Sequence, residues 1–304
     1  MSPLTDDAFR DLIDVRIGDP GRIATALSDR QRRDHVTIDG SLFIVAADHT
    51  ARGMIGIPGE PRAMANRHTM IERLLVALDN PRVDGVLGSA DILEDLVLLG
   101  ALDGRVAVGT MNRGGLAGAS WEIDDRFTAY DADHLAAANF DAGKMLLRID
   151  YDDAGTVPTL EACAQAVVAL NDRGLMAMVE PIPYTKDSSG KAVGHDDTDA
   201  LLKAVGVCAG MGGSSAYTWL KIQATADIES VAAMTTQPLL ILGGAPGLDP
   251  EATFASWEQA LAQPTVRGLV VGRALLYPPD GDVESAVGRA AELVTASAAA
   301  RSSQ

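Results

Sequence analysis

The lysine at position 221 has an unusual setting for a charged residue. It lies in the run YTWLKIQ, residues 217–223, which has the pattern of a buried strand. Burial disfavours the ammonium form of lysine and lowers its pKa. An amine that is neutral near pH 7 is a nucleophile able to form a Schiff base with a carbonyl compound. The same setting also suits a lysine whose stem packs while its ammonium reaches solvent or a carboxylate, so its partners decide the interpretation.

A second lysine and two carboxylates occupy comparable positions. Lys144, one of only five lysines in the chain, begins an apolar strand-like run, and Asp48 and Glu180 end two others. Lys144 would lower the pKa of Lys221 by repulsion between like charges. Glu180 or Asp48 could move protons during carbinolamine formation and carbon–carbon cleavage. Taken singly, Asp48 also suits a turn or helix cap, and Glu180 suits a structural ion pair with Lys144.

Residue types that bind anions follow the last two apolar runs. Gly243 and Gly244 follow one run, and Gly272 and Arg273 follow the next. Glycine lets backbone N–H groups approach phosphate oxygens, a helix N-terminus adds positive potential, and arginine presents a fork of donors. Glycines are also common in turns, so the position of these residues in the fold must support a phosphate site.

Eight short apolar runs, alternating with helical stretches, predict the elements that position these residues. This alternation predicts βαβ units and a parallel sheet, and eight units in about 250 residues match a (β/α)8 TIM barrel. A doubly wound sheet is the alternative, but the first predicted strand is not followed by G-x-G-x-x-G. The predicted strands are 42–48, 84–88, 106–110, 144–150, 175–180, 218–223, 239–243 and 268–272, and the predicted helices are 64–78, 90–98, 132–138, 160–173, 197–208, 228–235 and 250–261.

The predicted domain organisation is an N-terminal helical extension over residues 1–40 and a barrel domain over residues 41–304. The extension should contain two helices between residues 3 and 30, broken at the sequence DPG, residues 19–21. A final helix is expected over 284–300. The longest irregular segments, 111–130 and 184–196, follow strands, so we expect both to form loops at the catalytic face.

The barrel prediction brings the reactive residues together. Catalytic groups of this fold lie at the C-terminal ends of strands, and side chains alternate between the two faces of a strand. Lys144 and Arg148 therefore share one face, and they should converge with Glu180 and Lys221 at the mouth of the barrel. The loops after strands seven and eight are the usual phosphate site of this fold, which places Arg273 at the same mouth.

Charge and composition narrow the classes of partner. The formal net charge of −17 argues against nucleic acid and anionic membranes, so an anionic small substrate would need a local basic pocket. The N-terminus lacks an apolar signal region, no run reaches about 20 apolar residues, and the two cysteines imply no disulfide framework. We therefore expect a cytoplasmic protein, and its N-terminal helices would permit a homo-oligomer.

The histidine pattern gives no indication of a metal site. The five histidines form no close H-x-H or H-x-x-x-H pair, whereas a zinc site needs about three protein ligands. His49 alone lies beside a predicted strand end. The sequence therefore predicts metal-independent chemistry without a cofactor, which favours amine catalysis.

These residues also resemble a known family. The chain is similar to class I, Schiff-base aldolases of the tagatose-1,6-bisphosphate aldolase type, and more distantly to archaeal-type class I fructose-bisphosphate aldolases and deoxyribose-phosphate aldolases. The resemblance implies that Lys221 is the Schiff-base lysine and Glu180 the acid/base residue, with Lys144 and Asp48 as supporting charges. It also implies phosphate binding by the last two loops. The motifs that carry it span about residues 40–277: AADH at 46–49, RG at 52–53, GKMLL at 143–147, VEP at 179–181, LKI at 220–222, GG at 243–244 and GRA at 272–274.

The resemblance extends to an actinobacterial (β/α)8 branch associated with inositol catabolism. It implies a substrate such as 2-deoxy-5-keto-gluconate 6-phosphate, which would be cleaved to dihydroxyacetone phosphate and malonate semialdehyde. Gly243 replaces a serine that bisphosphate aldolases commonly have, which weakens the case for a bisphosphate. Arg148 replaces an aromatic residue and would suit a carboxylate on the aldehyde half.

Two other functions fit the same residues. In a sugar-phosphate isomerase or epimerase, Glu180 would move a proton and Lys221 would only neutralise charge. A non-catalytic barrel that binds phosphosugars would use the anion site alone. The paired lysines favour the aldolase, with a small-molecule sugar phosphate as the expected partner.

Overall fold

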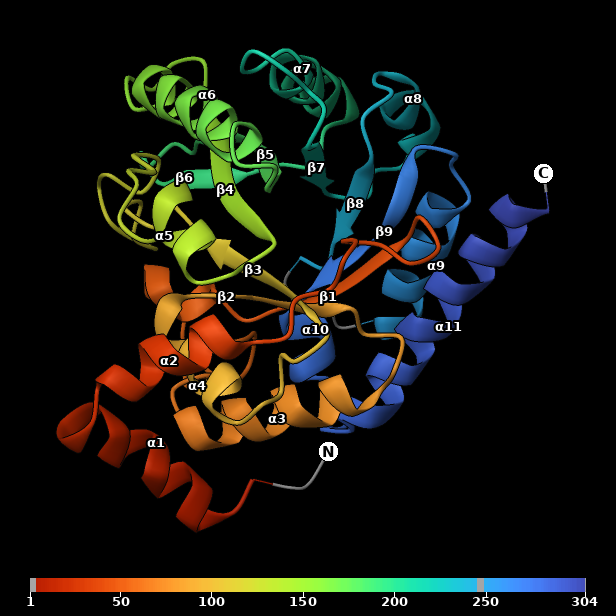
Figure 1. The fold of residues 1–304 in the computed structure, drawn as a ribbon. Coiled ribbons are helices and arrows are strands. Elements are labelled where there is room, and N and C mark those ends of the chain that lie inside the picture. The colour runs from red at the N-terminus through yellow and green to blue at the C-terminus, as the bar shows by residue number, and fades with distance from the viewer. Residues whose placement is uncertain (1–3, 245–248, 304) are drawn as a thin grey trace.

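Eight parallel strands form a closed barrel surrounded by helices (Figure 1). The computed structural model describes residues 4–244 and 249–303. The strand order is β4-β3-β2-β1-β9-β8-β7-β5, and pairing between β4 and β5 closes the ring. This is a (β/α)8 TIM barrel, so the fold-class prediction is confirmed.

Each barrel strand is followed by at least one helix, as the alternating sequence pattern predicts. The strands are β1 (Leu42–Ala46), β2 (Gly85–Gly88), β3 (Val106–Thr110), β4 (Ala142–Ile149), β5 (Met176–Lys186), β7 (Thr218–Ile222), β8 (Leu239–Leu242) and β9 (Val266–Val271). The helices after them are α3 (Arg67–Asp79), α4 (Ala90–Leu98), α5 (Ala132–Ala137), α6 (Thr156–Asn171), α7 (Thr198–Ala209), α8 (Ile228–Ala233), α9 (Pro250–Leu261), α10 (Arg273–Leu276) and α11 (Val283–Ser302).

Side-chain alternation divides the strands between two apolar layers. Phe43 and Val45 point outward and join the large core beneath the helices. Met176 and Met178 point inward and help to fill the lower part of the barrel. Glu180 continues the inward series of β5, so the packed interior ends in a charged group at the C-terminal end of the barrel.

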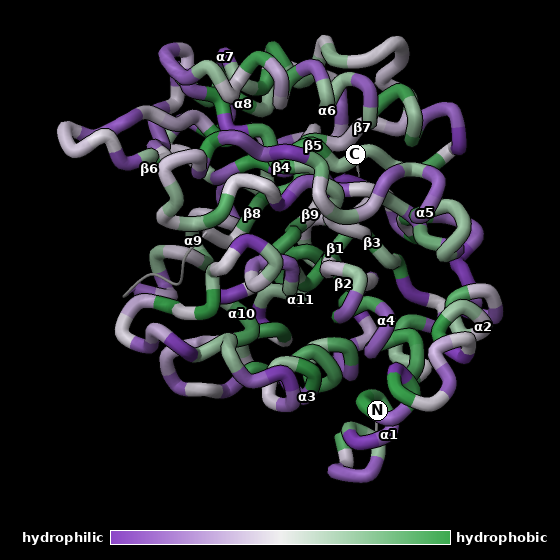
Figure 2. The backbone as a smooth tube through the Cα atoms, turned by 90° about the vertical axis from the view of Figure 1, so that its left-hand side faces the viewer, coloured by the Kyte–Doolittle hydropathy of each residue, from purple (hydrophilic) through white to green (hydrophobic). Residues whose placement is uncertain are grey.

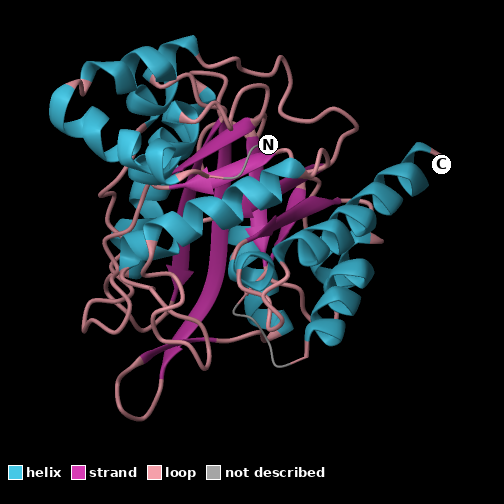
Figure 3. Ribbon diagram, turned by 90° about the horizontal axis from the view of Figure 1, so that it is seen from below, coloured by secondary structure: helices cyan, strands magenta, loops and turns pink. Residues whose placement is uncertain are grey.

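Strand β5 is longer than expected. It continues through Pro181 and Pro183 to Lys186 and then pairs in antiparallel fashion with β6 (Ala192–Gly194). The expected irregular loop 184–196 is therefore mostly a β-hairpin, which extends past the helices (Figure 3). The prolines are accommodated because β7 pairs with β5 only as far as Val179, so beyond that residue their missing N–H groups remove no hydrogen bond to β7.

The N-terminal extension packs against α3 and α4 on the outside of the barrel, and the residue after α2, Arg30, reaches its N-terminal end. Helices α1 (Asp6–Gly18) and α2 (Gly21–Asp29) are separated at Asp19 and Pro20, as expected. In Figure 2, α2 and the β6 hairpin lie on opposite sides of the strands. Residues 1–3 of the predicted extension lie outside the described residues.

Arg30 fastens the extension to the barrel. Its fully buried guanidinium forms an ion pair with Asp141 at 2.8 Å and donates to the carbonyls of Arg105 at 2.9 Å and Asn139 at 2.8 Å. Asp141 also accepts a hydrogen bond from the backbone N–H of Ala107. Because these partners precede strands β3 and β4, Arg30 stabilises the N-terminal rim of the barrel.

Truncation of Arg30 is expected to destabilise the fold. Arg30→Ala leaves buried carbonyls without a donor and weakens the pairing of Asp141, so the free energy of unfolding should fall by about 3 kcal/mol. Urea denaturation followed by circular dichroism measures this change. Arg10→Ala is the matched control, because its ion pair with Asp7 is exposed and contributes little. Equal effects of the two substitutions would contradict a specific role for Arg30.

Candidate active site

A cavity opens at the C-terminal ends of the barrel strands. It is lined by all the predicted catalytic side chains, Lys221, Glu180, Lys144 and Asp48, and by Arg273 from the end of β9. These first four residues come from four different strands or the loops directly after them. The remaining lining residues are Ala46, His49, Arg52, Met54, Arg113, Leu146, Ile182, Tyr184, Leu242, Gly243, Gly244, Val270 and Gly272.

Glu180 bridges the two lysines. Its Oε1 lies 2.7 Å from Nζ of Lys221, and its Oε2 forms an ion pair with Nζ of Lys144. All three side chains are buried, with Lys144 1% and Lys221 5% exposed. The arrangement follows from the sheet, because β5 lies between β4 and β7 and all three residues face inward. One carboxylate therefore serves two amines.

The charge balance around Glu180 favours a neutral amine. Burial lowers the pKa of Lys221 against the opposing effect of Glu180, and Arg113 and Arg273 lower it further. Burial and then Arg113 lower the pKa of Lys144 well below its ordinary value. Burial works to raise the pKa of Glu180, but its interactions with Lys144 and Lys221 outweigh burial and lower that pKa. An ionised carboxylate beside an amine of lowered pKa suits nucleophilic attack on a carbonyl.

Asp48 is held by a residue that the sequence reasoning missed. Arg113 follows β3 and forms a buried ion pair with Asp48, whose carboxylate is also 3.8 Å from Nζ of Lys144. Nε of Arg113 donates to the Thr110 hydroxyl at 2.9 Å. Burial lowers the pKa of Arg113 to about 10. Its place just beyond a strand end was the available signal, but the irregular loop 111–130 gave no periodicity that would aim its side chain.

The residues predicted to bind an anion lie together at one side of this cavity. Gly243, Gly244, Gly272 and Arg273 all line it. Gly244 has φ +65°, and a Cβ on Gly272 would overlap the carbonyl oxygen of Ala46, so both positions require glycine. The rest of the predicted loop, residues 245–247, lies outside the described residues. Helix α10 (Arg273–Leu276) has only four residues, so it offers little of the positive potential expected from a helix N-terminus.

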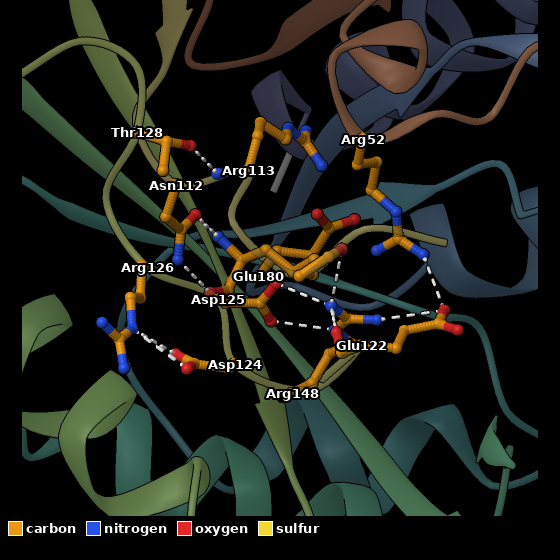
Figure 4. A network of polar contacts seen from close by, with 12 residues as sticks. Arg52, Asn112, Arg113, Glu122, Asp124, Asp125, Arg126, Thr128, Arg148 and Glu180 are labelled. Carbon is orange, nitrogen blue, oxygen red and sulfur yellow. Dashed lines mark hydrogen bonds and ion pairs between the residues drawn. The ribbon is translucent and has the colours of Figure 1, made fainter. Parts of the chain in front are cut away.

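Arg148 does not occupy the predicted position at the cavity. Its guanidinium is fully buried and forms a forked pair with Asp125, at 2.8 Å from Nε and 2.7 Å from Nη2 (Figure 4). It also donates to the carbonyl of Gly115 at 3.1 Å and lies against the ring of Tyr184. The assignment of Arg148 to substrate binding is therefore corrected. This arginine anchors loop 111–130, and residues near the end of that loop satisfy its charge.

His49 adds a neutral polar group beside the anion side. It begins the 3-10 helix η1 (His49–Arg52), and its ring would contact a Cβ placed on Gly272. Burial, then Arg273 and Lys221, lower its pKa well below the ordinary value. His49 is therefore a hydrogen-bonding group without charge near pH 7.

The described residues supply no cluster of three or more His, Cys, Asp or Glu side chains able to hold a metal ion. Cys163 and Cys208 are buried free thiols. A helix long and apolar enough to cross a membrane does not occur in residues 4–244 or 249–303.

Comparison with protein families shows which family the chain belongs to. A model of Cgl0159-like proteins matches residues 40–291. The chain belongs to the Cgl0159-like family. It is also similar to the crystal structure of Cgl0159 from Corynebacterium glutamicum (Brevibacterium flavum), with 47% identity over 97% of this chain and 99% of that one, and a TM-score of 0.94. No curated protein sequence matched.

More distant solved structures share the barrel. An archaeal fructose 1,6-bisphosphate aldolase is 18% identical over 90% of this chain and 99% of its own, with a TM-score of 0.67. An archaeal fructose-1,6-bisphosphate aldolase whose catalytic lysine is covalently bound to the carbinolamine intermediate is 18% identical over the same shares, with a TM-score of 0.64. At this identity the likeness of the Cgl0159-like chain to these aldolases is one of fold.

Proposed function

We propose that this Cgl0159-like protein is a metal-independent class I aldolase in which Lys221 forms a Schiff base with a ketose phosphate. The observation that carries the proposal is the carboxylate of Glu180 between two buried lysines, 2.7 Å from Nζ of Lys221. A barrel shared with Schiff-base aldolases supports it.

Lys221 is favoured over Lys144 as the nucleophile. Lys144 contacts both Glu180 and Asp48, so an anionic partner remains on either side of it. Among the described residues Lys221 forms an ion pair with Glu180 alone. It is the more exposed of the two lysines, and the charge of Arg273 at the anion side lowers its pKa. A ketone whose phosphate lies near Arg273 would therefore meet Lys221 first.

The proposed reaction uses the groups already in contact. The neutral amine of Lys221 adds to the ketone, and loss of water gives a protonated imine. A base, Glu180 or Asp48, removes the proton of the hydroxyl on the carbon to be released. The carbon–carbon bond breaks, its electron pair moves into the iminium, and an aldehyde leaves. Protonation of the enamine and hydrolysis then return the ketone and the free lysine.

The pocket charges support an anionic substrate. Arg52, Arg113 and Arg273 line the cavity with the two lysines, against the carboxylates of Asp48 and Glu180. In a chain of net charge −17, this local excess of cations favours a sugar phosphate. We propose 2-deoxy-5-keto-gluconate 6-phosphate, an inositol-derived compound, as the candidate to test beside fructose and tagatose 1,6-bisphosphates. A cytoplasmic setting accompanies this proposal.

Reductive trapping tests the proposed chemistry. Borohydride added to the full chain with dihydroxyacetone phosphate should reduce the imine and leave one covalent adduct, detected by whole-protein mass spectrometry. The adduct should also form in the presence of a chelator. An isomerase acting through Glu180 would instead convert dihydroxyacetone phosphate to glyceraldehyde 3-phosphate and leave the protein mass unchanged. That outcome would replace the aldolase proposal.

A further inference from the structure

Two arginines that line the cavity form no ion pair with the other charged residues that line it. Arg113 forms an ion pair with Asp48, and both lysines form ion pairs with Glu180. Arg52 and Arg273 line the same cavity without taking part in these pairs.

The side chain of Arg273 has no counter-ion among the described residues. Its guanidinium makes no hydrogen bond or ion pair within residues 4–244 and 249–303, and its Nε is a buried donor without a partner there. Burial and then the charge of Arg52 lower the pKa of Arg273, so a second cation lies within its electrostatic reach. A buried guanidinium beside another cation is stabilised by an anion that can accept from both.

Arg52 is positioned near Arg273 by the short helix η1. It ends η1, whose first residue, His49, packs against Gly272, the neighbour of Arg273. The side chain of Arg52 is buried, and its Nε also lacks a partner among the residues that the structure describes. The turn between β1 and α3 therefore brings a second guanidinium to the anion side of the cavity.

Arg52 forms a long ion pair with Glu122. Its Nη2 lies 3.4 Å from Oε1 of Glu122, which is 3.3 Å from Nη1 of Arg148 as well (Figure 4). The other oxygen of Glu122 accepts from the backbone N–H of Gly118 at 2.7 Å. Glu122 would thus keep two partners within its own surroundings if it left Arg52.

We infer that Arg52 and Arg273 form a two-arginine clamp for the phosphate monoester of the substrate, and that Glu122 competes with this phosphate for Arg52. The inference rests on the proposed function only for the identity of the molecule that carries the phosphate. A phosphate dianion has three terminal oxygens and can accept from both forks, which a single carboxylate oxygen of Glu122 cannot do. Arg52 is therefore a specificity residue for phosphorylated over unphosphorylated ketones.

Titration calorimetry with inorganic phosphate tests the clamp in the full-length protein. Arg52→Gln and Arg273→Gln should each raise the Kd for phosphate about 10- to 100-fold, since each removes a charge-assisted contact. Arg52→Lys keeps the charge but not the fork, so its loss should be smaller. Glu122→Gln removes the competing carboxylate and should tighten binding about two- to fivefold. Arg126→Gln is the matched control, because the side chain of Arg126 is exposed and forms an ion pair with Asp124 in the same loop.

Thermal denaturation of each variant separates loss of binding from loss of folding. The clamp is overturned if folded Arg52→Gln and Arg52→Lys bind phosphate as tightly as the wild type, if the wild type binds no phosphate, or if Glu122→Gln weakens binding. These titrations contain no carbonyl compound, so they do not depend on an imine. If borohydride trapping fails but Arg52→Gln weakens phosphate binding, the aldolase proposal is wrong and the clamp stands. If trapping succeeds but Arg52→Gln binds phosphate as the wild type does, the clamp is wrong and the aldolase proposal stands.

Discussion

Lys221→Met is expected to abolish carbon–carbon cleavage while the protein remains folded. The substitution removes the only atom able to form the proposed imine, so the loss in kcat should be on the order of 10⁴-fold or more. Folding should survive because Glu180 keeps its ion pair with Lys144 and methionine fills a similar volume. A coupled assay for dihydroxyacetone phosphate release measures the loss.

Lys191→Met controls for the loss of a lysine as such. Lys191 is exposed in the β5–β6 turn, outside the cavity. Its replacement should leave cleavage unchanged. Retention of more than a small fraction of the activity by Lys221→Met would point instead to proton transfer by Glu180, as in an isomerase.

Glu180→Gln is expected to cause the second-largest loss. The amide keeps the shape of the side chain but cannot accept a proton, so kcat should fall roughly 10²- to 10⁴-fold. The carboxylate also raises the pKa of Lys221, and its removal should lower that pKa further. A lower amine pKa makes the neutral nucleophile available at lower pH, so the acid limb of the pH profile should move to lower pH.

The direction of the pH shift distinguishes a role of Glu180 in the reaction from a role in folding alone. Glu180→Asp retains a carboxylate and should recover part of the rate, whereas Glu258→Gln, an exposed change on α9, should alter neither rate nor profile. Thermal denaturation shows whether the buried lysines still permit folding. A full-rate Glu180→Gln enzyme, or an acid limb moved to higher pH, would contradict the proposed role of Glu180.

The barrel could be predicted from the sequence because its strands are short and buried. Val106–Thr110 was predicted without error, since an apolar run between turn-forming residues leaves little freedom in its ends. The end of β5 was misplaced because Pro181 and Pro183 favour a strand stop, whereas here their missing N–H groups lie where β7 no longer pairs with β5.

The site was predicted where it depends on strand alternation alone. Lys144, Glu180 and Lys221 meet because adjacent parallel strands bring inward-facing residues to one height. Arg148 obeys the same alternation, but its partner Asp125 lies in an irregular loop that no periodicity positions. The contacts of Arg113 and Arg52 depend on loop conformations for the same reason, so their place at the cavity emerges only from the structure.

Locating the covalent adduct tests the role of Lys221 most directly. The full chain is treated with borohydride and dihydroxyacetone phosphate, digested, and mapped by tandem mass spectrometry. A single modified lysine, Lys221, is expected, with Lys144 unmodified. An adduct on Lys144, or turnover of a verified substrate with no adduct on any lysine, would contradict this role.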